Sequence, residues 1–147
     1  MVHNVSLGQR EAQQAIAAIQ AELQQRGLAA VIAVADAHGE LIALLRLDGA
    51  RLPSIQIAAS KAWTAARECM PTRELGQAAR HPEDGFDMAY YGDPRYVGWG
   101  GGLPVFLDGQ VTGAVAVSGL PEQVDMELAQ IGVAAITQST EASSQRA

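Results

Sequence analysis

The chain of 147 residues carries 10 basic and 16 acidic residues, for a formal net charge of −6, and it is 48% hydrophobic. This length and apolar content suit one domain with its own hydrophobic core. The negative charge and the scattered basic residues argue against nucleic acid or a membrane surface as a partner, because both usually need a basic patch. No apolar run approaches the ~20 residues that span a bilayer. The N-terminus lacks a signal-peptide pattern, so we expect a cytoplasmic protein.

The first half of the chain predicts a helix, a hairpin and a second helix. Helical spacing of apolar residues indicates a helix over 7–26. Two runs rich in valine, isoleucine and leucine, 28–36 and 41–47, flank a tight turn and predict an antiparallel hairpin. A second helix is expected over 54–69, with Ser54 as its N-cap.

The second half predicts a short helix over 72–80, a hairpin of 103–107 with 110–118, and a last helix over 121–138. Single strands and helices do not alternate regularly, so an antiparallel sheet fits better than a parallel one. We therefore expect an α+β fold, with the sheet flanked by the N- and C-terminal helices and by a central helix pair. The domain should cover 1–138, and the small polar residues of 139–147 predict a disordered tail.

Several segments carry a family resemblance through their order and spacing. They are 34–41, 46–50, 54, 57–58, 61–65, 101–105, 108–109, 113–119, 121–123 and 125. Together they resemble the GlcG/HbpS-like haem-binding family, which is related to the C-terminal domain of PduO-type corrinoid adenosyltransferases. The resemblance implies a profilin-like domain that forms homo-oligomers. Since some relatives bind haem, it makes haem or another tetrapyrrole the first candidate ligand.

The expected helix over 54–69 has two distinct faces. Its core face should comprise Ile55, Ala58, Ala59, Ala62, Ala66 and Cys69. On the opposite face, Ile57 lies near Lys61, Thr64 and Glu68. This second stripe indicates a subunit interface or a ligand-site wall, unless it is a solvated surface with one stray isoleucine. A desolvated Lys61 could serve as a base, a Schiff-base former or a carboxylate anchor.

The segment 81–102 lacks sustained periodicity and concentrates the aromatic residues. Five of the seven aromatics lie in it: Phe86, Tyr90, Tyr91, Tyr96 and Trp99. Long loops inside compact domains are usually functional or disordered, and high aromatic content argues against disorder. The segment therefore predicts a ligand lid or pocket wall, an oligomer contact, or simple packing. The glycines at 100–102 that end it indicate a backbone approach to an anion or a bend before the next strand.

The candidate cofactor-binding residues follow from the resemblance together with these patterns. A haem iron needs an axial donor, commonly histidine, and His38 lies in the first hairpin turn. The remaining candidates are Tyr90, Tyr91, Trp99, Gly101 and Gly102. The histidines lack metal-site spacing such as H-x-x-x-H, so no separate metal centre is expected.

Two other functions stay open at this level. A small catabolic enzyme of isomerase or lyase type, acting on an aromatic or carboxylated metabolite, would use Lys61 or His81 as base, Tyr96 or a neighbouring tyrosine as acid, and Arg95 as a carboxylate clamp. An accessory domain without a ligand would bury the loop aromatics between subunits.

Overall fold

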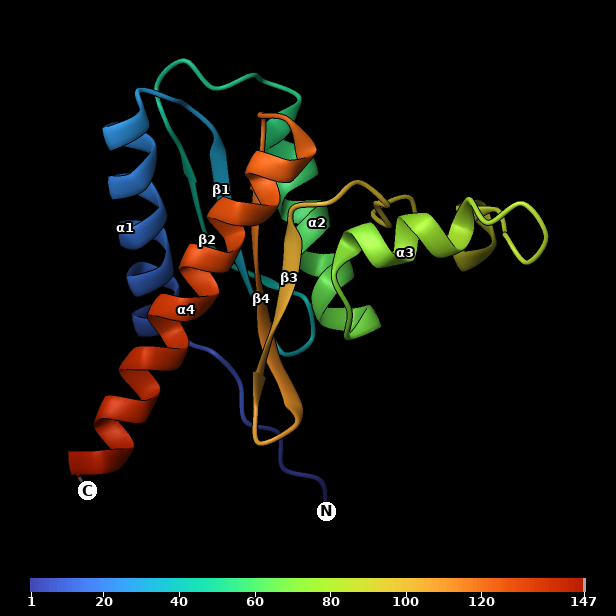
Figure 1. The fold of residues 1–147 in the computed structure, drawn as a ribbon. Coiled ribbons are helices and arrows are strands. Elements are labelled where there is room, and N and C mark those ends of the chain that lie inside the picture. Colours follow the sequence, from blue (N-terminus) through green and yellow to red (C-terminus); the bar gives the residue numbers. More distant parts are fainter. Residues whose placement is uncertain (147) are drawn as a thin grey trace.

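A computed structural model describes residues 1–146 and shows a four-stranded antiparallel sheet with helices on both faces (Figure 1). The elements are α1 (Gln9–Arg26), β1 (Val31–Asp36), β2 (Leu41–Arg46), α2 (Ser54–Glu68), α3 (Thr72–Ala79), the 3-10 helix η1 (Met88–Tyr91), β3 (Gly102–Leu107), β4 (Gln110–Ser118) and α4 (Glu122–Arg146). The strand order is β2-β1-β4-β3, and each neighbouring pair is antiparallel. The predicted α+β class and both predicted hairpins are confirmed.

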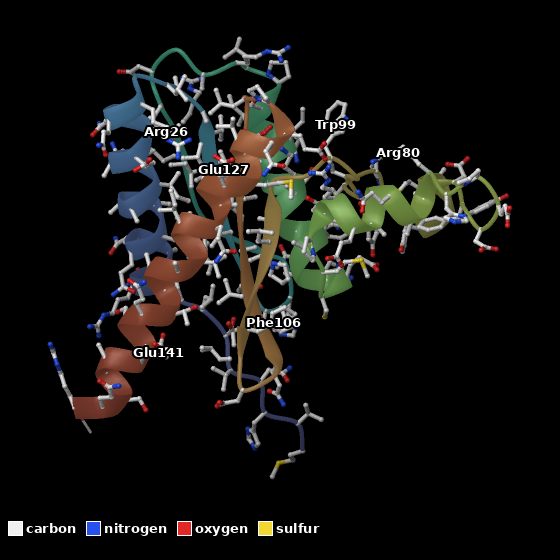
Figure 2. All side chains as sticks on the ribbon, in the orientation of Figure 1. Arg26, Arg80, Trp99, Phe106, Glu127 and Glu141 are labelled. Carbon is white, nitrogen blue, oxygen red and sulfur yellow. The ribbon has the colours of Figure 1, made fainter. Side chains whose placement is uncertain are left out.

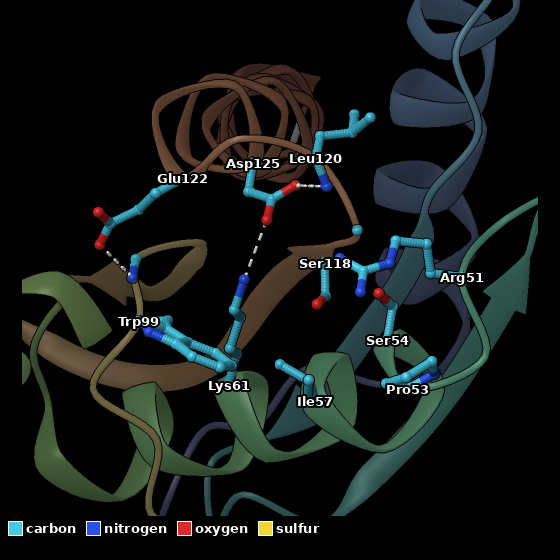
Figure 3. Close-up of a pocket in the computed structure, with 12 residues that line it drawn as sticks. Arg51, Pro53, Ser54, Ile57, Lys61, Trp99, Ser118, Leu120, Glu122 and Asp125 are labelled. Carbon is cyan, nitrogen blue, oxygen red and sulfur yellow. Dashed lines mark hydrogen bonds and ion pairs between the residues drawn. The ribbon is translucent and has the colours of Figure 1, made fainter.

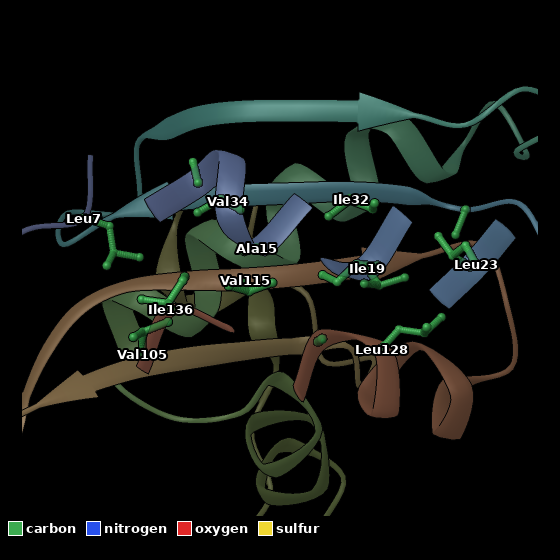
Figure 4. Packing of buried hydrophobic residues seen from close by; sticks show 14 residues of the cluster. Leu7, Ala15, Ile19, Leu23, Ile32, Val34, Val105, Val115, Leu128 and Ile136 are labelled. Atoms are coloured by element: carbon green, nitrogen blue, oxygen red, sulfur yellow. The ribbon is translucent and has the colours of Figure 1, made fainter. Parts of the chain in front are cut away.

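Alternation along β1 explains how the sheet carries a helical layer on each face. Ile32 and Val34 pack with α1 and α4, whereas Val31 and Ala33 face α2. Larger side chains fill the first layer, including Ile19, Leu128 and Ile136 (Figure 4). Alanines dominate both surfaces of the second layer, so the backbone of α2 lies close to the sheet. A polar side chain on α2 therefore meets β4 directly.

Helix α2 is buried on more sides than its periodicity predicts. Every residue from Ser60 to Ala66 is buried, because a loop covers the face opposite the sheet. The Thr64 hydroxyl donates to the carbonyl of Arg95 and accepts from the amide of Val97, at 3.2 and 3.1 Å. Cys69, expected in the core, is instead exposed at the left-handed C-cap of the helix, with a φ of 55°.

The segment from α3 to the start of β3 forms an arm that projects from the sheet (Figure 1). Gly76 of α3 lies directly against Gly98, and a Cβ at position 76 would overlap the Gly98 carbonyl oxygen. The arm leaves two aromatic side chains largely exposed, with Tyr90 at 87% and Trp99 at 62%. The simple-packing interpretation therefore does not account for these two residues.

Helix α4 continues through most of the predicted tail. It extends to Arg146, so residues 139–146 are helical where we expected disorder. A helix anchored by the buried Ile136 propagates at little cost, since each added residue brings a further hydrogen bond. Residue 147 lies outside the described residues. Within 1–146, no helix combines the length and the apolar character that crossing a membrane would require.

Candidate functional site

Two pockets lie towards opposite ends of α2, and their nearest lining residues on the helix, Lys61 and Ala66, are about 7.5 Å apart at 1.5 Å of rise per residue. The Lys61 pocket, of about 360 Å³, is near the N-terminal end (Figure 3). Its lining residues are Arg51, Pro53, Ser54, Ile57, Lys61, Trp99, Gly100, Ser118, Gly119, Leu120, Glu122 and Asp125. The His38 pocket, of about 670 Å³, is near the C-terminal end. Its lining residues are Asn4, Val5, Ala37, His38, Ala66, Arg67, Cys69, Tyr96, Phe106, Gly109, Gln110 and Val111.

A buried ion pair forms the base of the Lys61 pocket. Lys61 Nζ lies 3.1 Å from the Asp125 carboxylate, and each residue is only 2% exposed. The ammonium also donates to the Val117 carbonyl at 3.0 Å, and Asp125 accepts from the Leu120 amide at 3.1 Å. An ammonium has three donors, so one has no partner among the described residues. The pair ties α2 to β4 and to the first turn of α4.

Burial shifts both ionisable groups of this pair towards their neutral forms. Desolvation lowers the pKa of Lys61, and the charge of Asp125 opposes that shift. Desolvation likewise raises the pKa of Asp125, and the charge of Lys61 opposes it. Each charge therefore depends on the other to remain ionised in this environment. Ile57 lines the same pocket, so two residues of the second stripe of α2, Ile57 and Lys61, form part of a pocket wall, which was one of the alternatives.

The glycines of 100–102 pack around Lys61 and leave no open cradle for an anion. A Cβ on Gly101 would lie 2.6 Å from the Val117 carbonyl oxygen and 2.7 Å from Lys61 Nζ. The Gly102 amide donates to the Thr72 hydroxyl, and the Gly100 amide donates to the Glu122 carboxylate at 2.6 Å. The amides of Gly100 and Gly102 thus bind protein groups. The interpretation as a bend before β3 agrees with this arrangement.

The His38 pocket presents an imidazole from the turn between β1 and β2. The Asp36 carboxylate accepts from the amides of His38 and Glu40 at 2.9 and 3.0 Å, and this holds the turn. Arg67 donates to the His38 carbonyl at 3.2 Å. The backbone of His38 is therefore fixed, while its ring nitrogens bond to none of residues 1–146. Cys69 and Tyr96 line the same pocket from the end of α2 and from the arm.

Aromatic stacking positions Tyr96 beside the His38 pocket. Its ring lies 3.8 Å from that of Tyr91 in a stacked arrangement and 4.7 Å from that of Trp63 edge-on. The Arg95 guanidinium lies 4.2 Å from the Trp63 ring and 2.7 Å from the Asp93 carboxylate. The hydrogen bonds that the Arg95 side chain and the Arg95 amide donate to Asp93 lower the pKa of its carboxyl to about 2. Because Arg95 is engaged by Asp93 and Trp63, it is poorly placed to act as a free carboxylate clamp.

The predicted site residues fall into separate groups. Lys61 and Trp99 share the Lys61 pocket, whereas His38 and Tyr96 share the other. His81 accepts from the amides of Glu83 and Asp84 on the arm and lines neither pocket. The predicted catalytic set therefore does not meet in one place. Tyr90 and Tyr91 lie on η1 and also line neither pocket.

Some lining residues had no strong signal in the sequence. Arg51 lies in an irregular segment, and Phe106 points outward from an edge strand. Their positions are typical of ordinary surface residues, so no pattern singles them out. Phe106 lies towards the β3–β4 hairpin, well away from Trp99 (Figure 2). Among the described residues, no cluster of three or more histidine, cysteine or acidic side chains could hold a metal ion.

The chain is similar in sequence to two known proteins. It is 37% identical over 118 residues to protein GlcG of Escherichia coli strain K12, covering 80% of this chain and 85% of GlcG. It is 32% identical over 117 residues to corrinoid adenosyltransferase PduO of Salmonella typhimurium strain LT2, covering 80% of this chain. That match covers 35% of PduO, so the chain spans about a third of the relative's length.

A solved structure and a family model agree with these relatives. The crystal structure of a PduOC:haem complex is 30% identical and superposes with a TM-score of 0.82, covering 89% of this chain and 95% of that one. The family model described as "Haem degrading protein HbpS-like" matches residues 7–134. The matched range contains the sheet, the arm and the first part of α4, and on this basis the chain belongs to the HbpS-like family.

Proposed function

We propose that this protein binds haem, or another flat tetrapyrrole, in the His38 pocket. One observation carries the proposal: His38, Cys69 and Tyr96 line the same pocket, and the side chains of these three residue types are the common axial ligands of haem iron. The volume of about 670 Å³ lies within the range of small-molecule sites. The likeness to a haem complex and the family's description support the same ligand.

The chemistry of the pocket fits haem. The ring of His38 has no partner among residues 1–146, so it can bind iron without breaking an existing bond. Phe106, about half exposed, and Tyr96 supply apolar surface for the macrocycle. Arg67 offers a guanidinium for a propionate, although it already donates to the His38 carbonyl.

When bound, haem would supply the redox chemistry of its iron, and the chain would supply binding and orientation. His38 would hold the iron at the β1–β2 turn, whose backbone is fixed by Asp36. Tyr96, stacked on Tyr91, would limit the access of water from the arm. The family's description makes haem degradation the activity to test once binding is established.

Assembly into homo-oligomers belongs to the same proposal. Apolar side chains are exposed on three elements of the fold and on the loop before β3: Leu41, Tyr90, Trp99 and Phe106. Burying such surface between copies would stabilise an oligomer of closed symmetry. Sedimentation analysis should give a species that is a multiple of 15.4 kDa. A monomer at all concentrations would contradict this part.

A haem titration followed by the Soret band tests the ligand. We expect saturable binding to the unmodified chain and loss of the Soret shift in His38→Ala, with smaller changes in Cys69→Ser and Tyr96→Phe. His81→Ala is the matched control because His81 lies outside the pocket. His3→Ala tests the histidine next to pocket-lining Asn4. Binding that does not saturate, or that is equal in His38→Ala and His81→Ala, would overturn the proposal.

A further inference from the structure

We propose that the Lys61 pocket is a second, separate binding site that takes a small organic acid through its carboxylate. The feature that points to a ligand is a pair of serines. Ser54 and Ser118 are each only 4% exposed and both line the pocket. Their hydroxyls bond to no other side chain or backbone group within residues 1–146 and converge on the pocket in Figure 3. Each hydroxyl can donate a hydrogen bond to a carboxylate oxygen that enters the pocket, so one bound acid would engage both serines.

An arginine completes this donor cluster. Arg51 lines the same pocket, and its guanidinium forms no ion pair or hydrogen bond within residues 1–146, although its backbone carbonyl accepts from the Ser54 amide. A free guanidinium next to two hydroxyls matches a carboxylate, whose two oxygens accept several hydrogen bonds. Ser54 also opens the 15-residue helix α2, which has no side-chain cap, so the positive end of its dipole adds to the attraction.

The acidic side chains of the pocket are already engaged. Asp125 pairs with Lys61 and accepts from Leu120, and Glu122 accepts from the Gly100 amide. Two positive groups, Lys61 and Arg51, therefore balance two negative ones. A pocket with no excess positive charge suits a ligand with a single negative charge better than a polyphosphate.

The apolar wall and the volume of the Lys61 pocket further restrict the class of ligand. Ile57 and the exposed ring of Trp99 supply apolar surface opposite the polar groups. The volume of about 360 Å³ is near the lower end for ligand sites, and it is about half that of the His38 pocket. The occupant is therefore a monocarboxylate with a small apolar body, and the site does not depend on haem binding at the other end of α2.

Benzoate, with its uncharged analogue benzamide, is the first probe, and acetate and lactate follow. Amide NMR spectra should show saturable shifts at Ser54, Ser118 and Gly119 with a millimolar or tighter Kd for at least one acid, and none with benzamide. Arg51→Gln should weaken binding at least about tenfold, and Ser54→Ala with Ser118→Ala should weaken it about three- to tenfold. Arg10→Gln, an exposed arginine on α1, is the matched control and should bind normally.

Three results would overturn the proposal. They are no saturable shift with any of the three acids, equal binding of benzoate and benzamide, and unchanged binding in Arg51→Gln. Thermal unfolding of each variant confirms that it is folded before binding is compared. His38→Ala separates the two sites, because it should lose haem and keep benzoate. If haem loading of the unmodified chain abolishes benzoate binding, haem occupies the Lys61 pocket itself, and a separate site for a free acid is excluded.

Discussion

The two ends of α2 carry pockets built on opposite physical principles. At the N-terminal end, Lys61 and Asp125 are buried charges that hold three elements together, so the same atoms support the fold and line the site. At the C-terminal end, His38 and Cys69 are exposed and bear little of the packing. A substitution at the first end should therefore change both stability and binding. A substitution at the second end should change binding and leave stability nearly unchanged.

The largest effect is expected for Asp125→Asn, which leaves a buried ammonium without its counter-charge. We expect a loss of about 3–5 kcal/mol in the free energy of unfolding, measured by urea denaturation. Lys61→Met combined with Asp125→Asn should be less destabilised than the sum of the single variants, because the isolated charge is gone. A loss below about 0.5 kcal/mol in Asp125→Asn would contradict the buried pair.

Thr64→Val tests the hydrogen bonds that attach the loop around Tyr96 to the middle of α2, between the two pockets. It removes the hydroxyl that binds the backbone of Arg95 and Val97, so it should cost about 1–3 kcal/mol. It should also weaken haem binding, since Tyr96 lies between these two residues. Thr137→Val is the control, because that hydroxyl bonds only to the Val133 carbonyl within α4. Equal stability of the two variants would argue against this role of Thr64.

At the His38 end we expect binding to change without stability. His38→Ala and Cys69→Ser should leave the free energy of unfolding within about 0.5 kcal/mol of the original value, because both residues are exposed. The same urea curves that detect Asp125→Asn provide the measurement. A large loss of unfolding free energy in either variant would show that this pocket also supports the fold. The two ends of α2 would then not differ as we infer.

The smallest effect concerns the ion pair of Asp93 with Arg95. The pKa of Asp93 is about 2 in the folded chain, below its ordinary 3.8. The pair's contribution is therefore present above about pH 4 and is lost as the pH falls towards 2. Asp93→Asn should differ from the original chain above pH 4 and converge with it below, and salt should reduce the difference because the pair is exposed. A constant difference across this range would contradict the pair's role.

Local patterns predicted most of the elements. Valine-rich runs predicted β1 and β4, and helical spacing predicted α1 and α2. Ile57 on the polar face of α2 lines a pocket, which agrees with one of the alternatives that the sequence left open. These signals lie within one element, where the side-chain period reports which face avoids water.

Tertiary structure alone decided which residues meet. Asp125 is 64 positions from Lys61, and no local period connects them. Ser54 was expected to cap α2, yet Pro53 occupies the cap position and the serine hydroxyl lines a pocket. Tyr96 joins His38 and Cys69 only because the chain around it folds back over α2. The sequence by itself determined the elements and their buried faces, because those depend on neighbours within a few residues. The two pockets depend on how distant segments pack, and that was settled only when the whole chain folded.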